Sequence, residues 1–174
     1  NSISQYNEVA GVNAKYPNGD FFNIAGNEVS SFNRGHGLAY NIPYDVSLGN
    51  WSDTENQAGW NIAALGTEDA LDWGDIVSDI KARGGFFYPA HPNDDVRPSA
   101  NVIWRFDELF RLDGITGLEV WNSANAVNSY ENKVALKYWD ELNVRGDKVY
   151  GIANSDAHGT APIGAAHIKA YLPS

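Results

Sequence analysis

Histidines and carboxylates with the chemistry of metal ligands fall close to the ends of predicted strands. His91 follows the run GFFYPA, and Asp156 and His158 follow the run KVYGIA. Glu28 lies near the end of the first predicted strand, and His36 lies between two glycines beside the second. In a chain without cysteine, carboxylates and neutral imidazoles form the ligand set of Zn, Mn or Fe bound for hydrolytic work. The candidate metal ligands are therefore Glu28, His36, His91, Asp156 and His158.

The last two candidates form a D-x-H sequence. On an extended segment, residues two apart project to the same side, so the carboxylate of Asp156 and the imidazole of His158 are expected to point to one place. A single D-x-H is common by chance. Five candidate ligands at four separate strand ends are a stronger indication, because chemistry in α/β folds gathers at the C-terminal ends of strands.

Each candidate also has a structural interpretation. His36, between glycines, is typical of a surface turn, and His91 could be a buried histidine bonded to a backbone carbonyl. Asp156 could cap a turn. Glu28 and Glu119 lie in apolar surroundings and need a partner, since an unpaired buried carboxylate is destabilising. A metal ion, an arginine or a pair of backbone N–H groups could be that partner.

Further polar residues could belong to the surroundings of the site. Glu119 lies inside the run GLEVW and Asn122 follows it. Arg97, in the loop after His91, could clamp a substrate anion, although a solvated loop charge is the simpler interpretation. His167 lies inside a strand pattern and is interpreted as structural.

The elements that must position these residues are short. Six apolar runs are typical of strands buried on both faces: 20–29, 37–42, 85–90, 117–121, 148–153 and 167–172. One helix is predicted from the acidic turn at 67–69 to Gly84, one from near Ser129 to Gly146, and a shorter one over 104–112. Their expected core-facing residues are Trp73, Ile76, Val77, Ile80, Ala135, Tyr138, Trp139 and Leu142.

Strands that alternate with helices through short connections predict an α/β fold with a mostly parallel sheet or a barrel. The irregular stretch 43–65 is predicted to be an insertion. Nothing else divides the 174 residues, so we expect a single domain over 1–174.

Composition excludes several classes of function. Acidic residues outnumber basic ones 22 to 12, giving a formal net charge of -10, which argues against nucleic-acid binding and a polybasic membrane anchor. No run approaches the roughly 18 to 20 apolar residues of a membrane span. The absence of cysteine excludes disulfides, thiolate nucleophiles and Cys-ligated zinc.

The order of these motifs resembles the PHP family (polymerase and histidinol phosphatase), closest to its stand-alone phosphoesterases and its carbaryl-hydrolase-like branch. The motifs that carry the resemblance are G-N-E-V-S, G-H-G, P-A-H-P, G-L-E-V-W-N and N-S-D-A-H-G. They span nearly the whole chain outside 43–65. The resemblance implies a distorted β/α barrel with up to three divalent metals at the strand C-termini.

The resemblance also implies residue roles. Glu28 matches a bridging glutamate, His36 the histidine that follows it, and His91 the histidine of H-P, three residues that together hold one metal in the family. Asp156 and His158 match the final D-x-H, which serves the other metals. Glu119 matches a family segment in which it would be either a ligand or a residue that shapes the pocket or supports the ligands from outside, and Asn122, at the end of that segment, would support the ligands or contact substrate.

The family's opening H-x-H and D-H motifs are absent, and residues 1–4 resemble the family segment that comes directly after those motifs. We therefore expect a barrel that is incomplete at its N-terminal end and lacks four ligand positions. The implied function is a metal-dependent hydrolase that acts on a small-molecule substrate, in the first place a phosphoesterase that cleaves a phosphate ester with metal-activated water. A hydrolase of non-phosphate esters or carbamates, and a non-catalytic metal-binding fragment, are the alternatives.

Overall fold

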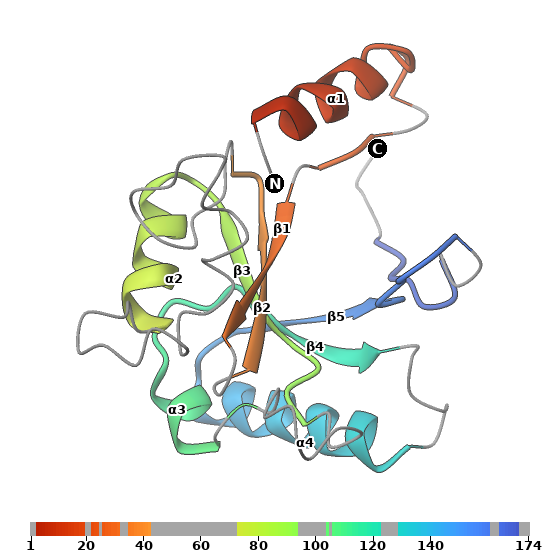
Figure 1. Ribbon diagram of the computed structural model, residues 1–174. Coiled ribbons are helices and arrows are strands. Elements are labelled where there is room, and N and C mark those ends of the chain that lie inside the picture. Colours follow the sequence, from red (N-terminus) through yellow and green to blue (C-terminus); the bar gives the residue numbers. More distant parts are fainter. Residues whose placement is uncertain are drawn as a thin grey trace.

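The computed structural model describes residues 3–19, 22–24, 26–31, 35–42, 73–93, 104, 106–122, 129–160 and 164–170. Its elements are α1 (Ile3–Asn13), β1 (Gly26–Ser31), β2 (Gly35–Tyr40), α2 (Trp73–Ala82), β3 (Phe86–Ala90), α3 (Phe106–Arg111), β4 (Gly117–Asn122), α4 (Tyr130–Arg145) and β5 (Tyr150–Asn154) (Figure 1). The predicted insertion over 43–65, the acidic turn at 67–69 and Arg97 lie outside the described residues.

The strands form two sheets, and the larger one is antiparallel. β2 pairs with β1 on one side and with β3 on the other, both antiparallel, whereas β4 and β5 pair in parallel. The prediction of a mostly parallel sheet is therefore wrong for the first three strands. Only residues 32–34 join β1 to β2, and a parallel pair needs a crossover of about a dozen residues or more. Within the described part of the chain the strands close no barrel.

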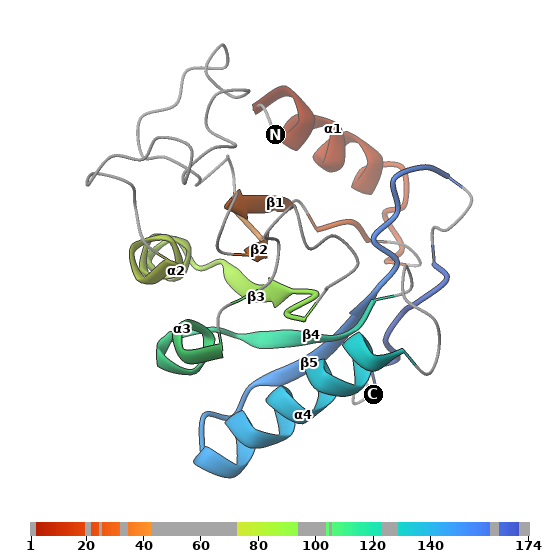
Figure 2. The ribbon, with the colours of Figure 1, turned by 60° about the horizontal axis from the view of Figure 1, so that its bottom comes forward.

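Thr116 joins the two sheets. Its N–H donates to the Phe87 carbonyl at 2.8 Å, and its hydroxyl accepts the Phe87 N–H at 3.1 Å. Its own carbonyl accepts the Tyr150 N–H at 3.1 Å. β4 consequently lies beside β3, as Figure 2 shows, so the two sheets are neighbours.

The helix α2 confirms the periodicity expected for it. Trp73, Ile76, Val77 and Ile80 are all buried against the sheet. At its end, Gly84 adopts φ 77°, and the Gly85 N–H donates to the Ile80 carbonyl at 2.9 Å. This left-handed glycine cap ends the helix where the sequence predicts.

The helix α4 confirms its predicted ends. The Ser129 side chain accepts the Asn132 N–H at the start, and Gly146 at φ 106° is the left-handed cap at the end. Ala135 and Leu142 are buried, while Tyr138 and Trp139 are partly buried against the core.

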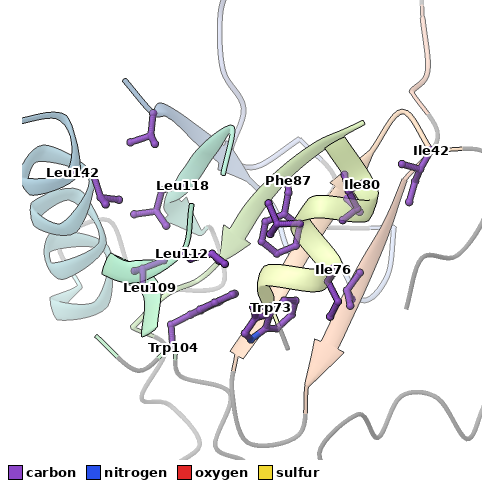
Figure 3. Close-up of a cluster of buried hydrophobic side chains, with 14 residues drawn as sticks. Ile42, Trp73, Ile76, Ile80, Phe87, Trp104, Leu109, Leu112, Leu118 and Leu142 are labelled. Atoms are coloured by element: carbon purple, nitrogen blue, oxygen red, sulfur yellow. The ribbon is translucent and has the colours of Figure 1, made fainter. Parts of the chain in front are cut away.

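The hydrophobic core lies between the sheets and the helices α2, α3 and α4 (Figure 3). Its largest aromatic members are Trp73, Phe87 and Trp104, whose rings contact one another. None of the helices in the described ranges has the length and apolarity that a membrane span needs.

Three elements differ from the sequence prediction by more than one or two residues at an end. Helix α1 was not expected, because its segment carries no acid in the first turn and no base in the last. β1 is shorter than the predicted strand 20–29 and ends later. Residues 167–170 of the last predicted strand form no strand and are exposed, so their β propensity finds no sheet to pack on.

Candidate metal centre

The antiparallel sheet brings three of the candidate ligands together. Glu28 comes from β1, His36 from β2, and His91 directly follows β3. The register that pairs Ser30 with His36 and His36 with Ala90 places these positions at one end of the sheet. One ligand atom from each of the three side chains lies within 4.8 Å of the others.

The Glu28 carboxylate contacts both imidazoles. Its Oε1 is 2.8 Å from Nδ1 of His36 and 3.4 Å from Nε2 of His91, and the two rings are 5.0 Å apart at 75°. Because an ionised carboxylate only accepts, each contact needs a proton on the facing ring nitrogen. Ligand atoms around a tetrahedral ion with 2.0–2.1 Å bonds are about 3.4 Å apart. The three side chains therefore fit a divalent cation after small adjustments.

The site is closed on one side and open on the other. The His91 side chain is 6% exposed, that of His36 23% and that of Glu28 38%. Three protein ligands with an accessible side are the arrangement of a catalytic metal site, in which another position stays available for water or substrate.

A buried carboxylate supports His91 from behind. The His91 N–H donates to Oε2 of Glu119 at 2.5 Å, and His91 itself has φ 27°, a conformation that L residues rarely adopt. Glu119 is 1% exposed. Neither Oε1 of Glu119 nor Nδ1 of His91 has a hydrogen-bond partner among the described residues, although both atoms are buried. The backbone N–H partner of Glu119 is one of the alternatives that the sequence left open.

The electrostatics of the cluster favour a cation. Burial raises the pKa of Glu28, but hydrogen bonds and positive charge from His36 and His91 outweigh burial and lower it. Burial lowers the pKa of His91, but the hydrogen bond to Glu28 and the charges of Glu119 and Asp156 raise it. Burial raises the pKa of Glu119 to about 7, with Asp156 adding to the effect. His91 is thus surrounded by carboxylates that attract positive charge.

Asp156 and His158 do not join this group among the described residues. They lie beyond the end of β5, and Asp156 has φ 46°, so the extended geometry expected for the D-x-H sequence is wrong. His158 is exposed, and its Nδ1 lies 2.9 Å from the Asp156 carbonyl. Asn154 caps the turn by accepting the Asp156 N–H at 2.6 Å. The structural interpretation of Asp156 as part of a capped turn therefore describes its backbone.

Two asparagines position the Asp156 carboxylate, and the sequence singled out only one of them, Asn122. The Asn122 side chain donates to Oδ2 of Asp156 at 3.2 Å. Asn132, which was not expected, bonds both backbone groups of Asn122: it accepts the N–H at 3.1 Å and donates to the carbonyl at 3.2 Å. Its place three residues after the Ser129 cap is the signal that could have singled it out.

The remaining histidine lies outside the cluster. His167 is exposed, and its Nδ1 is 3.3 Å from the Gly164 carbonyl. A second residue that the sequence analysis missed is Trp104, whose indole N–H donates to the His36 carbonyl at 2.7 Å. No sequence pattern marks it, because the contact joins residues 68 apart.

Comparison with known proteins identifies the class of fold. No family model matches the sequence, and no curated protein is significantly similar to it. The fold resembles a two-domain protein of Bacteroides vulgatus that contains a predicted PHP-like metal-dependent phosphoesterase, with a TM-score of 0.51 and 18% identity over 84% of this chain. It also resembles a protein of Bifidobacterium adolescentis described as a predicted metal-dependent phosphoesterase, with a TM-score of 0.57 and 16% identity over 91% of this chain.

The chain spans 35% of the first of these proteins and 74% of the second. At such identities the likeness concerns the fold: a mixed α/β structure of the kind seen in PHP-like phosphoesterases. The expectation of a PHP-like α/β fold is confirmed at this level, and the strands close no barrel in the residues that the structure describes; that the barrel lacks N-terminal strands stays a prediction.

Proposed function

We propose that this chain provides a metal centre for the hydrolysis of phosphate esters. The observation that carries the proposal is the convergence of Glu28 in β1, His36 in β2 and His91 directly after β3, whose ligand atoms lie within 4.8 Å of one another. The fold it shares with two predicted metal-dependent phosphoesterases supports the choice of substrate class. Zn, Mn and Fe are the ions that this donor set suits.

A divalent ion bound there would lower the pKa of a water molecule and neutralise charge on phosphoryl oxygens. An acidic protein with a net charge of -10 can therefore bind an anionic ester without a basic patch. The lowered pKa of Glu28 keeps its carboxylate ionised at neutral pH, as a ligand must be.

The histidines must give up protons to act as ligands. In the cluster as it stands, Nδ1 of His36 and Nε2 of His91 face the Glu28 carboxylate, so both nitrogens must be free of hydrogen before they bind. The ring proton of His91 then belongs on its buried Nδ1. Glu119, bonded to the backbone of the same residue, has an oxygen without a partner among the described residues and is the proposed acceptor for that proton.

Asp156 and His158 are proposed as ligands of a further ion. The support is the Asn122 side chain, which holds the Asp156 carboxylate beyond the end of β5, and the negative charge that Asp156 exerts on His91.

Metal content tests the centre. Protein purified without chelator should contain Zn, Mn or Fe by elemental analysis, and His91→Ala should lose it because a buried ligand is removed. His167→Ala, which removes an exposed histidine outside the cluster, is the control and should keep the wild-type metal content. Equal metal content in the two variants would contradict the assignment.

Substrate choice is tested by activity. The metal-loaded chain should hydrolyse an aryl phosphate faster than the matching aryl acetate or aryl carbamate, and His91→Ala should not. A preference for the carbamate or the acetate would replace the phosphoesterase with another hydrolase. Metal binding without any turnover would leave a non-catalytic metal-binding module.

A further inference from the structure

The backbone of His36 accepts a hydrogen bond from a tryptophan side chain. The indole N–H of Trp104 donates to the His36 carbonyl at 2.7 Å, and Trp104 is 2% exposed. The bond joins residue 104 to β2, although the two are distant in sequence. It acts on the main chain of a candidate ligand and leaves the imidazole free to face Glu28.

The glycines on both sides of His36 let the backbone approach aromatic rings. A Cβ at Gly35, which has φ 88°, would lie 2.6 Å from the indole of Trp104. A Cβ at Gly37 would lie 2.2 Å from the ring of Phe87. Such distances are well inside van der Waals contact, so only glycine fits there without displacing a ring. The sequence G-H-G therefore places His36 directly on an aromatic surface.

Trp104 is itself held in place by the core. Its ring centroid is 4.6 Å from that of Trp73, the first residue of α2, and 6.4 Å from that of Phe87 in β3 (Figure 3). A displacement of Trp104 would consequently meet packed side chains. The position of the His36 backbone is thereby tied to α2 and to β3.

We propose that Trp104 is a positioning residue of the metal centre: its indole hydrogen bond and its packing under Gly35 set where His36 presents its imidazole. The inference rests on the proposed function. Metal ligands must be held within about 0.5 Å of their productive positions. Loss of a residue that supports a ligand typically weakens metal binding about 10- to 100-fold.

A purely structural role would have different consequences, and the chain offers a matched control. Trp139 in α4 is partly buried, and its indole N–H donates to the Val149 carbonyl at 2.9 Å. Trp139→Phe removes the same kind of hydrogen bond as Trp104→Phe. None of the candidate ligands lies on α4.

The experiment compares the two variants in metal titrations of the chelator-treated chain. We expect Trp104→Phe to bind Zn²⁺ about tenfold or more weakly than wild type and to change the visible spectrum of bound Co²⁺, which reports ligand geometry. Trp139→Phe should stay within about twofold of wild type with an unchanged spectrum, even where urea unfolding shows that both variants lose similar stability. Equal Zn²⁺ affinities and equal Co²⁺ spectra would overturn the proposal.

The wild-type chain gives a second readout, in which the two variants serve only to assign signals among the six tryptophans. Zn²⁺ should shift the indole ¹H–¹⁵N signal of Trp104 and leave that of Trp139 unchanged, with Trp104→Phe and Trp139→Phe assigning the two signals. If the chain binds Zn²⁺ but the Trp104 signal does not shift, the positioning role alone is overturned. Failure of the wild-type chain to bind metal would overturn the proposed function and this inference together.

Discussion

Glu119 is a buried carboxyl group whose pKa lies well above its ordinary value. Burial raises the pKa of its carboxyl to about 7, although the His91 N–H opposes the shift. Its carboxylate touches the backbone of a candidate ligand, so a change of its charge reaches the metal centre. The same residue also affects the stability of the metal-free fold.

The free energy of unfolding of the metal-free chain should fall between about pH 4.5 and 7. In that range the folded state keeps the Glu119 proton while the unfolded state has released it, so the unfolded state binds fewer protons and rising pH favours unfolding. A shift from 4.5 to about 7 corresponds to about 3 kcal/mol. The pKa of His91 is also raised in the folded state, so its protonation stabilises the folded state by a constant amount below about pH 6.5. That contribution is lost only above this pH, where the unfolded histidine has already released its proton.

Urea unfolding of the chelated protein at several pH values measures the effect. Glu119→Gln removes the titrating group but keeps an oxygen for the His91 N–H, so its stability should stay level between pH 4.5 and 6.5. Glu141→Gln, on the surface of α4, is the matched control and should follow the wild type. The same decline in Glu119→Gln as in wild type would show that another group is responsible.

At the scale of elements, the end of α4 nearest the site is fixed by a short polar network. Ser129 caps the helix by accepting the Asn132 N–H, and the Asn132 side chain bonds the backbone of Asn122 at the end of β4. Asn122 in turn holds Asp156 beyond β5. A helix cap, two strand ends and a candidate ligand are therefore connected.

Ser129→Ala should lower the free energy of unfolding by about 1 kcal/mol, because it leaves a helix N–H without its side-chain acceptor. Ser78→Ala, at an exposed position within α2, should be neutral or slightly stabilising, because alanine is the better helix former. Zn²⁺ affinity at the site of Glu28, His36 and His91 should be unchanged in both, because the hydrogen-bond network from Ser129 leads to Asp156 and includes none of these three residues. Urea titrations followed by circular dichroism check the stabilities, and a neutral Ser129→Ala would mean that the cap contributes nothing.

At the scale of the whole molecule, the metal centre joins strands that are far apart in the chain. Glu28 and His91 are 63 residues apart, and the structure between them includes α2 and part of the core. A ligand that binds only the folded state stabilises it by mass action. Metal binding should therefore stabilise the complete α/β unit and not only the β1–β2 hairpin.

Zn²⁺ at 100 times its dissociation constant should stabilise the chain by about 2.7 kcal/mol, which raises Tm by about 5 to 10 °C in a domain of this size. Calorimetry with added Zn²⁺ and then with EDTA measures this shift and its reversal. His167→Ala should show the full shift and His91→Ala almost none, because only His91 belongs to the cluster. A full shift in His91→Ala would place the binding site elsewhere.

The sequence by itself determined the local features. The spacing of Trp73, Ile76 and Ile80 and the caps Ser129 and Gly146 act within a few residues, so two helices and their ends follow from neighbouring side chains. The kinds of side chain at the site also follow from the sequence, since carboxylates and imidazoles recur near several predicted strand ends and together form a metal-ligand set.

Tertiary structure decided how those features meet. The antiparallel pairing of β2 with β3, the bond from Asn122 to the Asp156 carboxylate and the support of His36 by Trp104 depend on groups distant in the chain. A local pattern states which face of a segment prefers to be buried, but not which other segment will cover it. For that reason the local patterns could name the candidate ligands, and only the family resemblance grouped Glu28, His36 and His91, whereas their convergence is decided by the strand pairing of the folded chain.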